Sequence, residues 1–394
     1  MLKVFLLIIS FIVIVAIEVL KVYFIMPFPG SQAGGTIEVA YFIHTYVIYL
    51  RIVAWIFFLY NLYHVWGRTS VSAKIIIGIF IAVYIFIFMA FNYYFVADQI
   101  FYQPKNKVFV SESENKIDPK QLVIGVYLGK EAKAYPLEII GYHHQVRDVV
   151  GGVPVMVTYC TVCRTGRVFS PVVDGKEETF RLVGMDLFNA MFEDATTKTW
   201  WRQVNGEAVV GPLAGKTLQE IPSAQMSLQA WLQQYPDAKI MQGDTTFQQG
   251  YDDLKYYDEG KIPSGLERRD SLSWRNKSWI VGVQIGSKAR AYDWNDLVSQ
   301  RVINDTLDGT PIALTIEPDS TTFYVLKRDT LVFSFDRQEN VLRDSNTLST
   351  WQWNGQCKAG PLNNIRLQHM QSYQEFWHSW KTFRPYTSKY DLRR

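Results

Sequence analysis

The sequence predicts three transmembrane α-helices followed by a duplicated, β-rich α+β extracytoplasmic region with a pseudo-two-fold internal repeat. Three observations lead to this fold class: long apolar runs near the N-terminus, a sequence pattern that recurs after residue 100, and short apolar segments separated by turn residues. We expect residues 1–99 to form the membrane unit and residues 100–243 and 279–394 to form two copies, joined by a linker at 244–278.

Three apolar runs occupy positions 4–24, 39–66 and 75–96. Each is near or above the roughly 20 residues that a helix needs to cross a bilayer. A signal peptide is the alternative for the first run, because Lys3 precedes a short apolar stretch, but no small-residue cleavage site follows closely. We therefore expect three helices in contact with the lipid bilayer.

Basic residues in this unit predict its orientation. Residues 1–97 carry five basic and two acidic side chains, so the whole net charge of +3 belongs here. Arg68 and Lys74 lie between the second and third runs, and basic loops tend to stay in the cytoplasm. The sequence thus predicts a protein of the bacterial inner (cytoplasmic) membrane, with a cytoplasmic N-terminus and periplasmic C-terminal domains. No basic excess points to nucleic acid.

Glu18 and Arg51 are charged residues well inside the predicted spans. Arg51 lies near the centre of the second, where an arginine costs about 2.5–3.5 kcal/mol on insertion scales and needs a partner. Glu18, in the first span, is at a depth that two long side chains can bridge. The pair either holds the helices together or marks a site for a quinone head group, a proton or a partner subunit. His44 and His64 are too far apart along one helix to share a metal.

An internal repeat covers the rest of the chain. Residues 125–135 align with 282–292 without a gap and share six identities in eleven positions. A duplication of this kind indicates two related domains. Residues common to both copies are expected to be scaffold that makes buried polar bonds: Asp148, Asp305, Asp194, Trp201, Asp344 and Trp351.

The first copy is predicted to be mostly strand. Gly151-Gly152 is expected to form a hairpin turn, and Pro136 to start a short helix at 137–141. An amphipathic helix is expected at 225–234. The predicted strands are 123–128, 132–135, 145–150, 153–159, 167–173 and 179–183.

A cysteine pair occurs in one copy only. Cys160 and Cys163 follow an apolar strand of the first copy, where the second copy has a stretch without cysteine. Such a pair can form a small disulfide ring in thiol–disulfide redox chemistry, with charge from Arg164 or Arg167 lowering a thiol pKa. It can also bind copper or zinc, completed by His143 or His144. A plain stabilising disulfide remains open as well. His143 is the predicted catalytic base in the redox hypothesis.

Several motifs of the chain form a recognisable set: Ala134-Tyr135-Pro136, Gly152-x-Pro154, Thr158-Tyr159-Cys160-x-x-Cys163, Asp194-x-x-Thr197-x-Thr199-x-Trp201 and Phe376-Trp377-x-x-Trp380. Together they resemble the bacterial domain-of-unknown-function family 3179 over roughly residues 107–390. The resemblance implies an extracytoplasmic protein of unestablished activity, and some relatives described as selenoproteins favour redox work at this motif. The chain departs from the family pattern where Thr161-Val162 replace the usual Pro-Leu and His144 replaces an acidic residue.

The functional hypotheses differ in whether the protein is an enzyme. Redox work at Cys160 and Cys163 and metal handling with His143 are two of them. The third is a non-enzymatic accessory subunit or scaffold of a larger membrane complex, for which Arg51 and the cysteine-free copy would supply partner surfaces.

Overall fold

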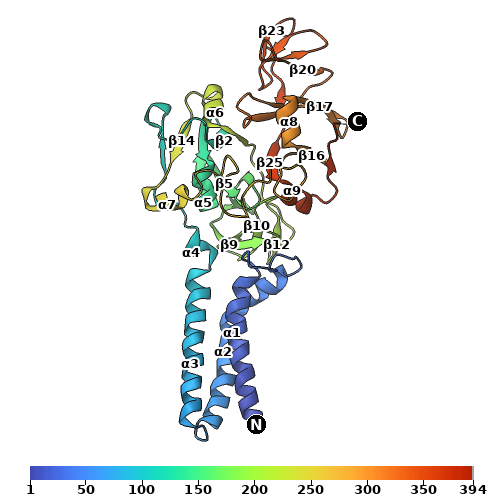
Figure 1. The fold of residues 1–394 in the computed structure, drawn as a ribbon. Coiled ribbons are helices and arrows are strands. Elements are labelled where there is room, and N and C mark those ends of the chain that lie inside the picture. The colour runs from blue at the N-terminus through green and yellow to red at the C-terminus, as the bar shows by residue number, and fades with distance from the viewer. Residues whose placement is uncertain (393–394) are drawn as a thin grey trace. The chain divides into compact units, whose positions relative to one another are not determined.

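A computed structural model describes residues 1–392 (Figure 1). Contacts divide the chain into two compact units. The first unit consists of Met1–Tyr102, Glu178–Arg202 and Glu207–Thr217, and the second contains the remaining described residues. The predicted boundaries at residues 99, 243 and 278 were drawn from the sequence repeat, whereas these units are defined by contacts. The predicted boundaries therefore stay a prediction.

Three long apolar helices open the first unit, as predicted. They are α1 (Leu2–Tyr23), α2 (Ile37–Trp66) and α3 (Val71–Met89), which a π-helical turn (Ala90–Tyr94) extends. All three are long and apolar enough to cross a membrane, and they run along one another in Figure 1. α3 begins before its predicted start because the Ser70 hydroxyl accepts a hydrogen bond from the Ala73 N–H and caps the helix. A short helix, α4 (Ala97–Ile100), follows the π-helical turn.

A four-stranded sheet completes the first unit. Its order is β12-β11-β10-β9, from β9 (Phe180–Asp186), β10 (Asn189–Asp194), β11 (Trp200–Arg202) and β12 (Ala208–Val210). The Trp200 ring meets the Tyr41 ring edge-on at 5.1 Å, and Ala40 is buried in the same cluster. The first turns of α2 therefore pack on protein rather than on lipid.

The second unit begins with a five-stranded sheet, in the order β1-β14-β3-β2-β13, and a three-stranded sheet, in the order β4-β5-β6. Helix α5 (Leu137–His143) connects them. The strands are β1 (Val108–Val110), β2 (Leu122–Leu128), β3 (Glu131–Pro136), β4 (Gln145–Val150), β5 (Val153–Cys160), β6 (Thr165–Phe169), β13 (Ala224–Ser227) and β14 (Lys239–Gln242).

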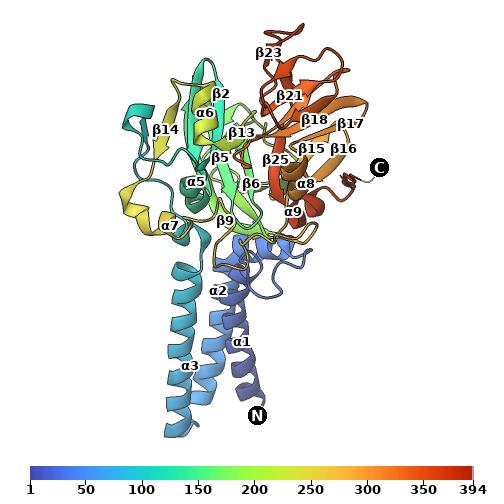
Figure 2. The same ribbon diagram turned by 45° about the horizontal axis from the view of Figure 1, so that its top comes forward.

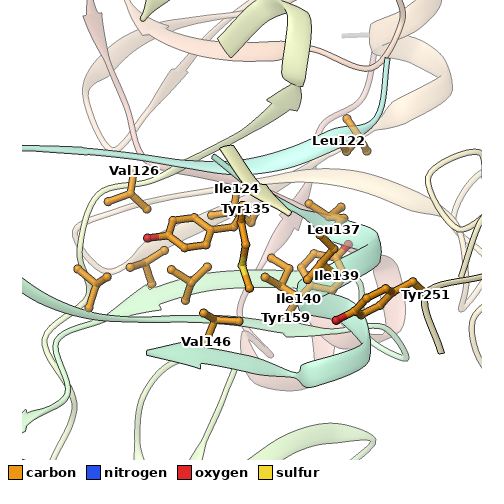
Figure 3. Packing of buried hydrophobic residues seen from close by; sticks show 14 of the residues in the cluster. Leu122, Ile124, Val126, Tyr135, Leu137, Ile139, Ile140, Val146, Tyr159 and Tyr251 are labelled. Atoms are coloured by element: carbon orange, nitrogen blue, oxygen red, sulfur yellow. The ribbon is translucent and has the colours of Figure 1, made fainter. Parts of the chain in front are cut away.

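An apolar core fills the space between these two sheets. Figure 3 shows Ile124 and Tyr135 of the larger sheet facing Val146 and Tyr159 of the smaller one. All four side chains are buried, as expected for strands that alternate or run apolar. Strand β5 packs in this core and ends at Cys160, so the core positions the first cysteine.

The same order of elements recurs in the rest of the second unit. Strands β25-β15-β16-β26 form a sheet in the order that β13-β2-β3-β14 follow earlier. A Cβ added to Gly282 would come within 2.3 Å of the Trp380 ring, and a Cβ added to Gly125 would come within 2.3 Å of the Trp231 ring. Each half therefore packs a tryptophan against a glycine at the same point of its sheet. The elements are β15 (Trp279–Ile285), β16 (Lys288–Asp293), α8 (Trp294–Gln300), β17 (Val302–Leu307), β18 (Thr310–Ile316), β19 (Phe323–Lys327), β20 (Phe333–Asp336), β21 (Val341–Asp344), β22 (Thr350–Trp351), β23 (Cys357–Ala359), β24 (Gln368–His369), β25 (Ser372–Phe376), α9 (Trp377–Phe383) and β26 (Ser388–Lys389).

Two predicted elements of the first copy differ from the structure. The helix expected at 225–234 begins only after β13, at α6 (Leu228–Gln234), because the Ser227 hydroxyl accepts from the Ala230 N–H and caps it. The strand expected at 167–173 ends with β6, since Pro171 has no N–H to donate. Smaller elements complete the chain: η2 (Glu112–Glu114), β7 (Val172–Val173), β8 (Lys176–Glu177), η3 (Thr245–Phe247) and α7 (Gln248–Asp252).

Candidate functional site

The cysteine pair lies at the end of the β5–β6 hairpin. Cys160 is the last residue of β5 and pairs with Thr165 of β6, and Cys163 is in the turn between them. Both side chains are fully buried. The structure describes them as thiols, with no disulfide among residues 1–392. Arg164, which follows, has a positive φ of 55°, so the hairpin turns sharply at the second cysteine.

Segments far along the chain cover this turn. The Tyr257 hydroxyl donates to the Thr161 carbonyl oxygen at 2.8 Å, and the Lys277 ammonium donates to the Val162 carbonyl oxygen at 2.6 Å. Strand β25 lies beside β6 (Figure 2), and its Phe376 N–H donates to the Cys163 carbonyl oxygen at 3.0 Å. The site is thus assembled from the hairpin, the 244–278 segment and the C-terminal strand and helix.

Burial controls the acidity of the second thiol. It raises the pKa of Cys163 well above its usual value, and a hydrogen bond with Cys160 acts in the same direction. A hydrogen bond with Ser379 and the charge of Lys277 oppose that rise. Burial also lowers the pKa of Lys277, and the negative charge of Cys163 or Cys160 in its thiolate form acts in the opposite direction. The dithiol is therefore favoured at neutral pH, with one cation beside it.

The arginines that follow the cysteines have other partners. The Arg164 guanidinium donates from Nε to Gln374 Oε1 at 2.9 Å and lies 3.9 Å from the centre of the Trp279 ring system. Arg167 is fully buried and donates to Glu375. The cation that acts on Cys163 is instead Lys277, which sequence reasoning missed because it is more than a hundred residues away.

The two histidines lie at the end of α5. His143 is buried, and its Nε2 is 2.7 Å from the Tyr251 hydroxyl oxygen. His144 ends the helix with a positive φ of 61°, and burial lowers its pKa to about 4. Among residues 1–392, no group of three or more His, Cys, Asp or Glu side chains is arranged to hold a metal ion. Copper or zinc binding at Cys160 and Cys163 with His143 or His144 stays a prediction.

The predicted scaffold residues make matching bonds in both halves of the sequence, buried at Asp194 and Asp344 and partly buried at Asp148 and Asp305. Tyr135 donates to Asp148 at 2.7 Å, and Tyr292 donates to Asp305 at the same distance. The indole N–H of Trp201 donates to Asp194 at 2.9 Å, as that of Trp351 does to Asp344. The indole bonds satisfy the buried carboxylates of Asp194 and Asp344.

The charged pair of the membrane helices meets inside the first unit. Arg51 binds Glu18 at two points, Nε to Oε1 at 2.7 Å and Nη2 to Oε2 at 2.5 Å. Asn92 of the π-helical turn donates to the same carboxylate at 2.9 Å, and Tyr84 of α3 donates at 3.3 Å. The carboxylate therefore connects all three helices. A further role for this pair, toward a quinone, a proton or another subunit, stays a prediction.

Three apolar helices followed by a β-rich α+β region with several small sheets define a membrane-helix protein with a large polar domain. The model of a protein family of unknown function, DUF3179, matches residues 103–387, and the chain belongs to that family. This confirms the resemblance and shows the three helices as a unit outside the matched region. No curated protein and no solved structure gave a significant match.

Proposed function

We propose that the protein is a membrane-anchored dithiol–disulfide protein that acts outside the cytoplasm. The observation that carries the proposal is the contact between the two thiols, since Cys163 is hydrogen-bonded to Cys160 within the turn of one hairpin. Two cysteine side chains in hydrogen-bond contact are close enough for a disulfide to form between them. The positive-inside rule supports the orientation, because Arg68 and Lys74 border the α2–α3 turn, whereas the β-rich region follows the other end of α3 along the chain.

The proposal includes the internal duplication. Residues 122–242 and 279–389 share one strand order, which supports two copies related by an approximate two-fold axis. Their contacts are reciprocal as well. The Phe376 N–H from the second half reaches the loop after β5, and the Ser227 N–H from the first half donates to Thr322 in the loop after β18 at 3.2 Å. One copy supplies the cysteines, and the other helps to enclose them.

The proposed reaction is exchange with a disulfide of a partner protein. The Cys160 thiolate attacks one partner sulfur, which breaks the partner disulfide and releases one partner thiolate. Cys163 then loses its proton and attacks Cys160, which closes the internal disulfide and releases the second partner thiol. The dithiol gives up two electrons and two protons, and the partner disulfide takes up both. The reverse sequence oxidises a partner dithiol.

Burial implies that a partner must open the site first. Both thiols are inaccessible, and the bonds from Tyr257 and Lys277 hold the turn between them. A small soluble oxidant therefore reacts slowly, whereas a protein that displaces this cover gains access. Such gating gives selectivity among disulfides without a change in potential.

A redox titration of the full chain in mild detergent tests the proposal. The protein is equilibrated in glutathione buffers of graded potential until no further change occurs, and thiols are tagged with a maleimide after unfolding. We expect one two-electron transition, absent in Cys160→Ser and retained in Cys357→Ser, whose thiol is also buried. If Cys160 and Cys163 remain reduced in fully oxidising buffer, the proposal is wrong. Metal analysis of the same preparation tests the copper or zinc alternative.

A further inference from the structure

The membrane helices enclose an apolar groove at the end where α2 turns into α3. Its volume is about 1040 Å³, and it is lined by α1, the last turns of α2 and the first half of α3. Leu7, Phe11, Phe58 and Phe80 are among the side chains on its walls. Lys3, His64 and Arg68 lie at the end of the groove near the turn. The groove is thus apolar along its length and polar at one end.

The depth of the groove matches one leaflet of a bilayer. Its lining positions run from 1 to 12 on α1, from 58 to 68 on α2 and the turn, and from 70 to 81 on α3. Each stretch rises by about 15 Å at 1.5 Å per residue. That is about half of the 30 Å hydrocarbon core of a bilayer. The polar end therefore coincides with the head-group level when the apolar end reaches the bilayer centre.

The polar end carries uncompensated positive charge. Among residues 1–392, neither Lys3 nor Arg68 has a carboxylate partner, and the Lys3 ammonium lies 4.3 Å from the centre of the Tyr60 ring. Residues 1–97 contain only two acidic side chains, and Glu18 is bound to Arg51 while Glu38 lies at the other end of α2. The first turn of α3 and the last turn of α2 both border this end, so their helix dipoles oppose each other and the net positive charge comes from Lys3 and Arg68. This combination fits a phosphate group.

We infer that the groove binds one anionic glycerophospholipid of the leaflet on the side of the α2–α3 turn. The phosphate lies against Lys3 and Arg68, with His64 as a further hydrogen-bonding group, and an acyl chain follows Phe11 and Phe58. A basic pocket between transmembrane helices favours an acidic head group in this way. A neutral quinone would fill the apolar part and leave both cations without a counter-charge. The inference does not depend on the redox chemistry.

Native mass spectrometry of the full chain tests the inference. The protein is reconstituted in nanodiscs of equal parts phosphatidylglycerol and phosphatidylcholine, released into detergent, and the retained lipid is counted. We expect about one phosphatidylglycerol per chain, and roughly thirtyfold weaker retention in Lys3→Gln/Arg68→Gln, the factor for removing two cationic contacts with an anionic lipid. Retention of phosphatidylcholine at the same level would overturn the assignment of an anionic lipid.

Two further variants separate a bound lipid from general attraction to the membrane. Lys74→Gln is the matched control, because Lys74 is near the same turn but lies over the Trp66 ring and does not line the groove. Ala73→Phe fills the groove without a change of charge. We expect full retention in the first variant and loss in the second. Equal loss in Lys74→Gln, or full retention in Ala73→Phe, would overturn the inference. Unchanged unfolding temperature and redox titration confirm that each variant is folded.

Discussion

The two hairpins β5–β6 and β18–β19 stand at matching points of the strand order but end in different loops. Cys160 pairs with Thr165 across four loop residues, whereas Ile316 pairs with Phe323 across six. The first loop contains the second cysteine and is covered by distant segments. The second is polar, and the Asp319 carboxylate accepts from two N–H groups of its own turn, those of Thr321 and Thr322.

The way each loop is held explains this difference. In the second hairpin, Arg301 donates to the Glu317 carbonyl oxygen at 2.8 Å and to the Ser320 hydroxyl at 3.0 Å. The corresponding residue after α5 is His144, whose ring is buried. The first loop depends on Tyr257 and Lys277 instead. The comparison teaches that a loop held largely by distant segments leaves its own positions available to side chains that do not stabilise the turn, such as those of the two cysteines.

The largest expected effect tests whether the shared scaffold is equivalent in both halves. Asp194 accepts from Thr197 and Trp201, and Asp344 accepts from Thr347 and Trp351; the two tryptophan bonds are buried and the two threonine bonds are partly buried. Replacement by alanine leaves these donors without a partner. We expect Asp194→Ala and Asp344→Ala each to lower the free energy of unfolding by about 4 kcal/mol, the upper range for a broken buried network.

Thermal unfolding of both variants in the same detergent measures this. Asp194→Asn and Asp344→Asn are the matched controls, since the amide keeps the shape and one acceptor, and they should lose less. A large loss in one alanine variant with none in the other would show that the two networks are not equivalent. The comparison between the halves would then be limited to strand order.

The next effect is the pH dependence of the free energy of unfolding that His144 causes. His144 follows helix α5, where the second half has Arg301 after helix α8. Burial lowers the pKa of His144 to about 4 in the folded protein, against a usual value of 6.5. A lowered folded pKa means that stability is fully present above pH 6.5 and is lost as the pH falls toward 4. The loss amounts to about 3 kcal/mol at 1.4 kcal/mol per pKa unit. Arg301 stands at the matching position of the second half.

Unfolding temperatures between pH 7.5 and pH 4 check this prediction. His144→Asn removes the titrating group and suits the positive φ of this position. We expect a flatter pH profile in His144→Asn than in the original chain. Arg301→Asn serves as the control and should leave the slope unchanged. If the unfolding temperature of His144→Asn falls with pH as steeply as that of the original chain, other groups cause the acid sensitivity.

Much of this architecture follows from local sequence, and the composition of the site does not. Apolar runs predicted the three helices, and Gly151-Gly152 correctly marked the turn between β4 and β5. Lys277 and Tyr257 could not be found this way, because they lie in a segment without periodicity and reach the cysteines only in the folded chain. The strand at β13 was missed because apolar spacing at 225–234 also fits a helix, and only the Ser227 cap separates the two.

A smaller effect sharpens the account of how the first loop is covered. Lys277→Met removes the cation that opposes the rise in the pKa of Cys163. The pKa then rises further, and fewer thiolates are present at a given pH. One pKa unit corresponds to roughly tenfold slower alkylation by iodoacetamide at pH 8. Lys261→Met, which removes an exposed lysine of the same segment, should have no effect. Equal slowing at Cys357 would indicate a general change in opening rather than a local charge effect.

The smallest effect concerns the second loop. Arg301→Asn keeps a residue that tolerates the positive φ of 66° but removes the bonds to Glu317 and Ser320. Two partly buried bonds of this kind contribute about 1 kcal/mol in total, so the overall stability changes little. Hydrogen exchange at residues 317–322 should become faster, while residues 161–164 keep their protection. Faster exchange at both loops would show that they open as one unit, linked by the bonds from Ser227 to Thr322 and from Phe376 to Cys163. The cover of the cysteines would then depend on the polar loop as well.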